Sequence, residues 1–102
     1  MKTLVWFRSD LRLEDNPALK NAFIESDEIH AVFIYSKVQL KRHNESNIKI
    51  DFLIRNLNIL EQSLASLNIP LILLNSKGFE DNGVLLNQYA IENSINTVYW
   101  NN

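Results

Sequence analysis

The chain has 102 residues, of which 46% are hydrophobic, enough to bury one core without disulfides or metals, so we expect a single domain over residues 1–102. It contains no cysteine, which excludes a disulfide framework, a thiolate metal site and a cysteine nucleophile. Its net charge is −2 and its ten Lys and Arg are scattered, which excludes strong nucleic-acid binding by this chain alone, because duplex binding needs clustered cations.

The first two elements follow directly from the amino terminus. Residues 3–7 (TLVWF) form a short β-branched and aromatic run, which predicts a buried strand. Asn16 can cap a helix with its side-chain oxygen, and Pro17 suits the first helical position because its missing N–H costs nothing there. This helix should extend to about residue 25, and it should bury Leu19, Ala22 and Phe23.

Two further strands and the longest helix come next. Residues 28–35 (EIHAVFIY) predict the second strand, and a polar loop over 36–46 follows it. Beyond the loop, leucine and isoleucine recur at intervals of three and four, which predicts a helix of about twenty residues with one apolar stripe. The stripe of this helix comprises Ile50, Leu53, Leu57, Leu60, Leu64 and Leu67. After the helix, the continuous apolar run 70–74 (PLILL) is typical of a central strand that helices bury on both faces.

The last elements complete an alternating order. Asp81 or Asn82 can cap a third helix that reaches about residue 93, and residues 97–100 (TVYW) predict a fourth strand. Alternating strands and helices predict a Rossmann-like α/β fold: an open, mostly parallel, doubly wound sheet of about four to five strands with helices on both faces. Ligands of such sheets bind at the carboxyl ends of the strands. Since the chain stops after the fourth strand, we expect that site to lack one wall.

Charged residues follow the first strand closely. Arg and Asp crowded into one turn tend to form bidentate pairs, so we expect Arg8, Asp10 and Arg12, with the cap Asn16, to form a structural network at the strand end. Direct contact of these residues with a ligand is the alternative. The only glycines are Gly78 and Gly83, so no glycine-rich phosphate loop follows the first strand.

Histidine and tryptophan are the remaining candidates for chemistry. His30 lies within a predicted strand, where a structural histidine with satisfied hydrogen bonds is expected. His43 lies in the loop after that strand, where it could donate a hydrogen bond to a ligand or lie on the surface. We expect Trp6 and Trp100 to pack in the core, because both fall inside predicted strands. No Ser/His/Asp arrangement and no metal-ligand spacing is present.

The end of the first strand and the turn after it contain three motifs: residues 6–8 (Trp-Phe-Arg), 10–12 (Asp-Leu-Arg) and 15–19 (Asp-Asn-Pro-Ala-Leu). Together these motifs resemble the opening of DNA photolyases and cryptochromes. The resemblance continues through 68–71 (Asn-Ile-Pro-Leu) and 92–94 (Glu-Asn-Ser), so it covers nearly the whole chain. It is closest to the folate-binding bacterial photolyases that repair cyclobutane pyrimidine dimers.

The resemblance implies a function for a larger parent protein. The parent would be a deoxyribodipyrimidine photolyase, a light-driven lyase whose following helical domain binds FAD and UV-damaged DNA. That helical domain is absent from these 102 residues, so the resemblance implies that this chain alone is not catalytic. His43 and Asn44 look like the His-Asn stretch that contacts a methenyltetrahydrofolate antenna in the folate-binding branch. The Asn-Glu pair that helps hold the folate in that branch would lie beyond Asn102.

Two other functions stay open. The parent could be a cryptochrome-type blue-light photoreceptor, or the chain could be a free-standing module that binds a nucleotide or another small ligand. A sheet built to pack on a helical domain should expose apolar surface, so we also expect self-association. No apolar run reaches the ~18 residues that span a bilayer, and no signal-peptide zones are present, so we expect a cytoplasmic protein without a membrane partner.

Overall fold

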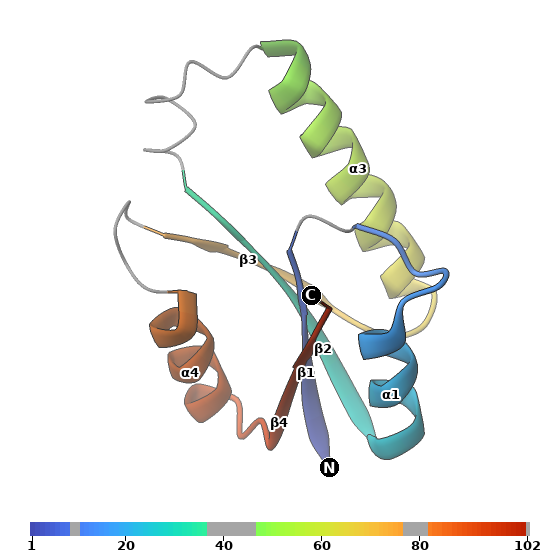
Figure 1. Ribbon diagram of the computed structural model, residues 1–102, viewed down its shortest axis with the longest axis vertical. Coiled ribbons are helices and arrows are strands. Elements are labelled where there is room, and N and C mark those ends of the chain that lie inside the picture. Colours follow the sequence, from blue (N-terminus) through green and yellow to red (C-terminus); the bar gives the residue numbers. More distant parts are fainter. Residues whose placement is uncertain (9–10, 37–46, 77–81, 102) are drawn as a thin grey trace.

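A computed structural model describes residues 1–8, 11–36, 47–76 and 82–101 of the chain. Strands and helices alternate along these residues, as the apolar patterning predicts (Figure 1). Within the described ranges, no helix combines the length and the apolar character needed to cross a membrane. The elements are β1 (Lys2–Phe7), α1 (Pro17–Glu25), β2 (Glu28–Tyr35), α3 (Asn47–Ala65), β3 (Leu71–Asn75), α4 (Asn82–Glu92) and β4 (Thr97–Trp100).

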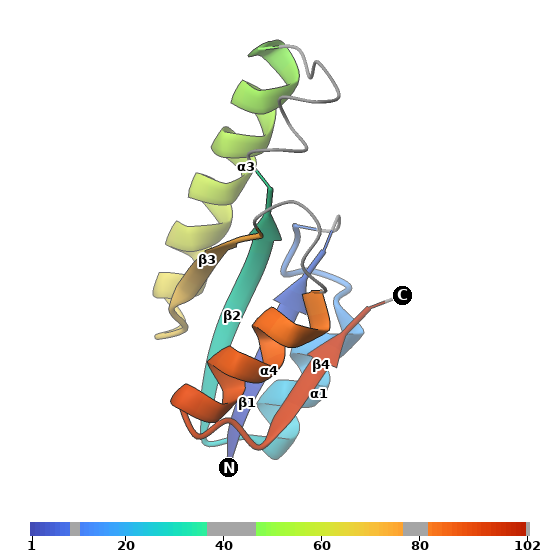
Figure 2. The same cartoon turned by 90° about the vertical axis from the view of Figure 1, so that its left-hand side faces the viewer.

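The four strands form one parallel sheet in the order β3-β2-β1-β4. β1 lies inside the sheet, where Val5 aligns with Ala31 of β2 on one side and with Tyr99 of β4 on the other. Helices cover both faces: α4 lies in front of the sheet and α1 behind it in Figure 2. This arrangement confirms the predicted open, doubly wound α/β fold.

The larger core layer lies between the sheet and the helices α1 and α3. Alternate residues of β1 and β2 point into it, because successive side chains of a strand point to opposite faces. Burying each large apolar side chain stabilises the fold by about 1.5–3 kcal/mol. The buried members of this layer are Val5, Phe7, Ala18, Leu19, Ala22, Ile29, Ala31, Leu60, Leu64 and Ile69.

A smaller core layer lies on the opposite face, under α4. Its buried members are Leu4 and Val32 from the sheet and Leu86 from α4. Half-buried side chains, among them Trp6 and Val98, surround these three. The α4 face of the sheet is therefore less completely covered than the face under α1 and α3.

The predicted start of α1 is confirmed, but one of its predicted core residues is not. The Asn16 side chain accepts a hydrogen bond from the backbone N–H of Leu19, and Pro17 occupies the first helical position. Phe23, expected in the core, is 47% exposed. Ala18, Leu19 and Ala22 make the contact with the sheet, and each further residue turns about 100° around the helix axis, so Phe23 points away from it.

The stripe of α3 is buried only toward the carboxyl end of the helix. Leu60 and Leu64 are fully buried, whereas Leu53 is half-buried. Leu67, expected in the stripe, is exposed because the helix ends at Ala65. Asn68 then adopts a left-handed conformation with φ 61°, which is common for Asn after a helix and turns the chain so that Ile69 enters the core.

β3 lies at an edge of the described sheet and not at its centre, contrary to the prediction. Its burial is partial, and Leu73 is exposed. β2 is its hydrogen-bonded neighbour among the described strands, and α3 packs mainly through its carboxyl-terminal half. A continuous apolar run occurs both in central strands and in half-covered edge strands, so the run by itself does not distinguish the two positions.

Removing the buried side chain of Leu64 tests how α3 packs on the sheet. We expect Leu64→Ala to lower the free energy of unfolding by about 2–5 kcal/mol, because it leaves a cavity in the larger core layer. The matched control is Ile91→Ala on the exposed side of α4, which should change stability by less than about 0.5 kcal/mol. Urea denaturation followed by circular dichroism measures both. Equal losses for the two variants would contradict the packing of α3.

Candidate functional site

Two tryptophans lie side by side where β1 and β4 end. Trp6 and Trp100 align in the strand register, and their ring centroids are 6.3 Å apart with the planes inclined at 58°. Trp6 is half-buried against the smaller core layer, but Trp100 is 49% exposed. The prediction that Trp100 packs in the core is therefore wrong. Trp100 is the last residue of β4, an edge strand of the described sheet. It lies on the face of the sheet that α4 covers, which is the less completely covered of the two faces.

Arg8 extends this aromatic pair with a positive charge. Its guanidinium carbon lies 4.8 Å from the centroid of the Trp6 ring, in the geometry of a cation–π contact. Among the described residues, Arg8 takes part in no ion pair, so its charge faces solvent at the carboxyl edge of the sheet. A half-exposed indole and a cation at one edge can together hold a planar ring that carries a carboxylate.

Asn16 and Asn101 connect the start of α1 to the end of β4. Asn16 is buried, and its Oδ1 accepts hydrogen bonds from the Leu19 N–H at 3.0 Å and from Asn101 Nδ2 at 2.7 Å. Its Nδ2 donates to the carbonyl of Arg12 at 2.9 Å. In return, Asn101 Oδ1 accepts from the Ala18 N–H at 3.0 Å. We call Asn16 and Asn101 the asparagine clamp.

The sequence predicts the role of only one member of the asparagine clamp. The N-cap role of Asn16 follows from its place before Pro17, because capping is a local property of the chain. Asn101 carries no such local pattern, and its partner lies 85 positions away in the sequence. Only the parallel pairing of β1 with β4 brings the two side chains together.

The other predicted strand-end residues are placed only in part. Arg12 is exposed and takes part in the turn through its carbonyl, while Asp10, His43 and Asn44 lie outside the described residues. The turn itself packs through the half-buried side chains of Leu11 and Leu13 against the larger core layer. Within the part of the chain that the structure describes, no three acidic or histidine side chains gather to hold a metal ion.

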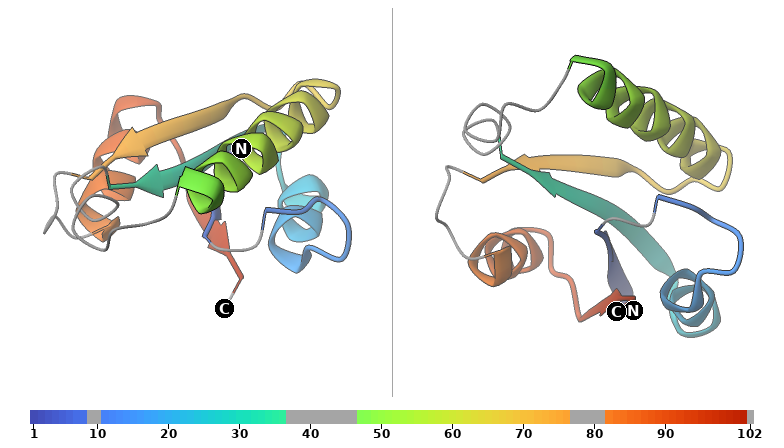
Figure 3. Two further views of the ribbon diagram at one scale, coloured as in Figure 1. Left: turned by 90° about the horizontal axis from the view of Figure 1, so that it is seen from above. Right: turned by 45° about the horizontal axis from the view of Figure 1, so that its top comes forward.

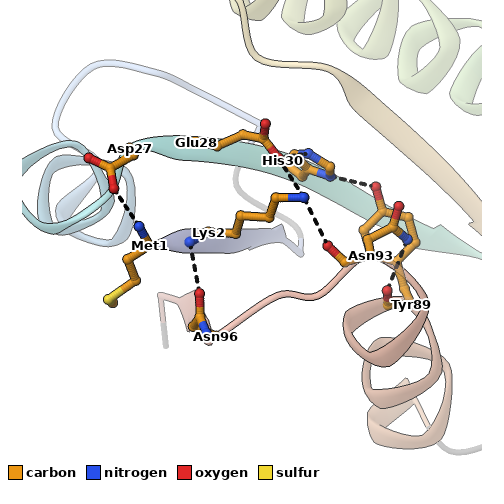
Figure 4. A network of polar contacts seen from close by, with 8 residues as sticks. All are labelled: Met1, Lys2, Asp27, Glu28, His30, Tyr89, Asn93 and Asn96. Carbon is orange, nitrogen blue, oxygen red and sulfur yellow. Dashed lines mark hydrogen bonds and ion pairs between the residues drawn. The ribbon is translucent and has the colours of Figure 1, made fainter.

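A second polar cluster lies at the opposite, amino-terminal edge of the sheet (Figure 4). His30 is at its centre: Nδ1 shares a hydrogen bond with the Tyr89 hydroxyl at 2.8 Å, and Nε2 shares one with Glu28 at 3.0 Å. Lys2 adds an ion pair with Glu28 at 3.4 Å and donates to the carbonyl of Asn93. Both ring nitrogens of His30 are thus satisfied, as expected for a structural histidine.

This amino-edge cluster lowers the pKa of its carboxylates. Hydrogen bonds from His30 and then from Lys2 hold the pKa of Glu28 below its ordinary value, and the hydrogen bond from the terminal ammonium of Met1 does the same for Asp27. Both carboxylates are exposed, so water and salt screen these interactions. The cluster lies at the edge away from the usual ligand crevice of such sheets, and we interpret it as a brace between β1, β2 and α4.

Comparison with known proteins points to one family. Residues 3–102 match the sequence model of the DNA photolyase family. The deoxyribodipyrimidine photo-lyase of Vibrio cholerae is 39% identical over 87 residues, which cover 85% of this chain and 19% of that protein. The enzyme of the same name from Escherichia coli is 35% identical over 99 residues, covering 96% and 21% respectively. Cryptochrome-1 of Arabidopsis thaliana is 36% identical over 70 residues, covering 69% and 10%. The chain thus spans about a fifth of the length of these two photolyase relatives.

Replacing either member of the asparagine clamp should loosen the join between α1 and β4. We expect Asn16→Ala to lower the free energy of unfolding by about 1–3 kcal/mol, because it removes a helix cap and leaves Asn101 without its partner. Asn21→Ala, on the exposed side of α1, is the control and should change stability by less than about 0.5 kcal/mol. A double-mutant cycle with Asn101→Ala should be less than additive. Strict additivity would refute the coupling.

The amino-edge cluster predicts how Glu28 titrates. In the folded chain the pKa of Glu28 should lie below its ordinary value of 4.5, and His30→Ala should move it back toward that value because the largest cause is removed. Since folding lowers this pKa, the stability that Glu28 contributes is present above its unfolded pKa and is lost as the pH falls through the folded one. NMR titration of the side-chain carboxyl measures the shift. The same titration curve in His30→Ala and in the unmodified chain would show that the hydrogen bond does not act on Glu28.

Proposed function

The chain belongs to the DNA photolyase family, and we propose that it is the amino-terminal antenna domain of a deoxyribodipyrimidine photolyase. The observation that carries this proposal is the match of residues 3–102 to the family, together with a parallel sheet whose carboxyl edge presents an exposed indole and a cation. Ligands of open α/β sheets bind at this edge. Because the chain covers about a fifth of its relatives, light-driven repair of pyrimidine dimers is proposed for the parent protein.

The described carboxyl edge is compatible with a folate antenna. Methenyltetrahydrofolate is a planar, conjugated ring system with a carboxylate-bearing tail, and Trp100 offers a half-exposed ring face while Arg8 offers a positive charge. We assign His43 and Asn44 as further contacts of the pigment, as the family resemblance implies. The bound pigment would supply absorbed near-ultraviolet or blue light as excitation energy for the flavin of the parent.

The strand-end residues would act as a scaffold for this pigment. The asparagine clamp fixes the turn after β1 against the end of β4, and the contact of Arg8 with Trp6 orients the cation toward solvent. We assign Arg8, Asp10, Arg12 and Asn16 to this scaffold and not to catalysis. A turn held from both ends keeps the pigment contacts in place without reorganisation on binding.

The same edge does not suit FAD. A pyrophosphate needs a close approach of backbone N–H groups, usually provided by a glycine-rich turn after the first strand, and the turn after β1 contains no glycine. We therefore assign FAD, UV-damaged DNA and the repair chemistry to the remainder of a cytoplasmic parent, in which the flavin in its reduced form donates an electron to the dimer. The net charge of −2 is consistent with weak nucleic-acid binding by this chain itself.

A cryptochrome-type photoreceptor is the second candidate. It is favoured by the 36% identity with cryptochrome-1 of Arabidopsis thaliana, which covers 69% of this chain. Repair of DNA separates the two functions, because a photoreceptor of this type signals through a partner and repairs nothing.

Illumination of the parent protein tests the proposal. We expect the full-length protein, with its flavin reduced, to remove cyclobutane pyrimidine dimers from irradiated DNA in near-ultraviolet or blue light and not in darkness. Dimers are counted by a dimer-specific endonuclease assay. A protein that binds flavin and leaves the dimers unchanged in light would overturn the repair function and favour the photoreceptor.

Variants of the same protein test the antenna. His43→Ala should lower the near-ultraviolet absorbance of the bound pigment, while repair driven by light that the flavin absorbs directly should remain. Asn58→Ala, an exposed change on α3, is the control and should leave pigment content unchanged. Equal pigment content in both variants would contradict the role of His43.

A further inference from the structure

The outer face of α3 carries a second apolar stripe, opposite the one that packs on the sheet. Ile48 is 81% exposed, Phe52 is 68% exposed and Ile59 is 62% exposed, and Arg55 lies between them on the same face. We call these four residues the outer stripe. Figure 3 shows α3 at the periphery of the molecule, with the sheet on one side of it. Large apolar side chains aligned on a solvent-facing helix mark an interaction surface.

The spacing of the outer stripe is that of a coiled-coil seam. Its residues follow one another at intervals of four, three and four, which is the a/d pattern over two heptads. A coiled coil packs a knob from one helix into a hole formed by four residues of the other. Ile48, Asp51, Phe52 and Arg55 surround an open depression of about 260 Å³, at the i, i+3, i+4 and i+7 positions that form such a hole.

We propose that α3 pairs in an antiparallel manner with α3 of a second copy of this chain, through the outer stripe. The stripe is symmetric about the midpoint between Leu53 and Ile54, so a twofold axis there places Ile48 opposite Ile59 of the other copy. The same axis places Phe52 opposite Arg55, and both contacts occur twice. The stripe of a second copy therefore matches this stripe in register.

Charge selects the antiparallel direction. In a parallel pair the two Arg55 side chains would meet at the same level, which brings like charges together. In the antiparallel pair each Arg55 enters the depression of the other copy, where Phe52 offers a ring face and Asp51 a carboxylate. Asp51 and Arg55 form no ion pair with any residue of the described ranges, so both charges are available to the second copy.

The size of the stripe limits the strength of the pair. Covering one Phe and two Ile removes on the order of 400 Å² per chain, about half of the ~800 Å² per partner of a standard stable interface. The pair should therefore be weak and depend on concentration. This inference needs only the exposed face of α3, so it does not rest on photolyase activity.

Disulfide trapping tests the direction of the pair, because the natural chain contains no cysteine. In the antiparallel pair, the α carbons of positions 48 and 59 of different copies lie close enough for a disulfide, while two copies of position 48 lie about 16 Å apart along the axis. Under mild oxidation at high concentration, a mixture of Ile48→Cys and Ile59→Cys chains should form mixed disulfide dimers. Each variant alone should form few. Efficient dimers from Ile48→Cys alone would overturn the antiparallel arrangement.

Charge exchange tests the surface without removing apolar contacts. By sedimentation equilibrium, Asp51→Arg alone should weaken association at least about tenfold, and the double variant Asp51→Arg/Arg55→Asp should recover most of it, since opposite charges face each other again.

Removing an apolar side chain tests the stripe itself. Phe52→Ser should weaken association, while Ile54→Ser, exposed on the same helix outside the stripe, should not. Circular dichroism confirms folding of each variant. A monomer at millimolar concentration, or association unchanged by Phe52→Ser, would refute the proposal.

Discussion

The whole structure depends on the position of β1 between two strands that come later in the chain. Thr3 aligns with Ile29 on one side and with Thr97 on the other, so β1 is paired by segments 26 and 94 residues away. This double pairing brings Trp6 beside Trp100 and the cap of α1 beside Asn101. The described side chains that we assign to the carboxyl-edge site lie close to where these two pairings end. Without β4, the turn after β1 would lose the clamp that fixes it.

The two ends of the sheet have different chemistry. At the amino-terminal end, Glu28, His30 and Tyr89 satisfy one another and tie α4 to the strands. At the carboxyl-terminal end, the side-chain amides of Asn16 and Asn101 bond to each other, to N–H groups of α1 and to the carbonyl of Arg12, whereas Trp100 and Arg8 are exposed. One edge of the sheet is thus braced internally, and the other keeps exposed aromatic and cationic groups on which the proposed antenna role depends.

Local patterns predicted the fold class and nearly every element boundary, because strand and helix periodicity and the capping by Asn16 depend on neighbouring residues. The predictions are wrong where the burial of a residue depends on which other elements cover it. Phe23 and Leu67 are apolar residues that the turn of a helix, or its end, directs to solvent. Trp100 and β3 were expected inside the molecule and lie at the edges of the described sheet. Asn101 was missed because its role exists only through a contact across 85 positions, and the placement of His43 and Asn44 stays a prediction.

The long-range pairing of β1 has a consequence for synthesis of the protein. A ribosome adds about 5–20 residues per second, so roughly 5–20 s pass between the emergence of β1 and that of β4. During this interval one hydrogen-bonding edge of β1 lacks its partner, although the strand is among the most apolar segments of the chain. Pairing of β1 with β2, whose partner residues follow within 26 positions, can protect the other edge early. The β1-β2 pair with α1 can therefore form before residues 97–100 have been synthesised.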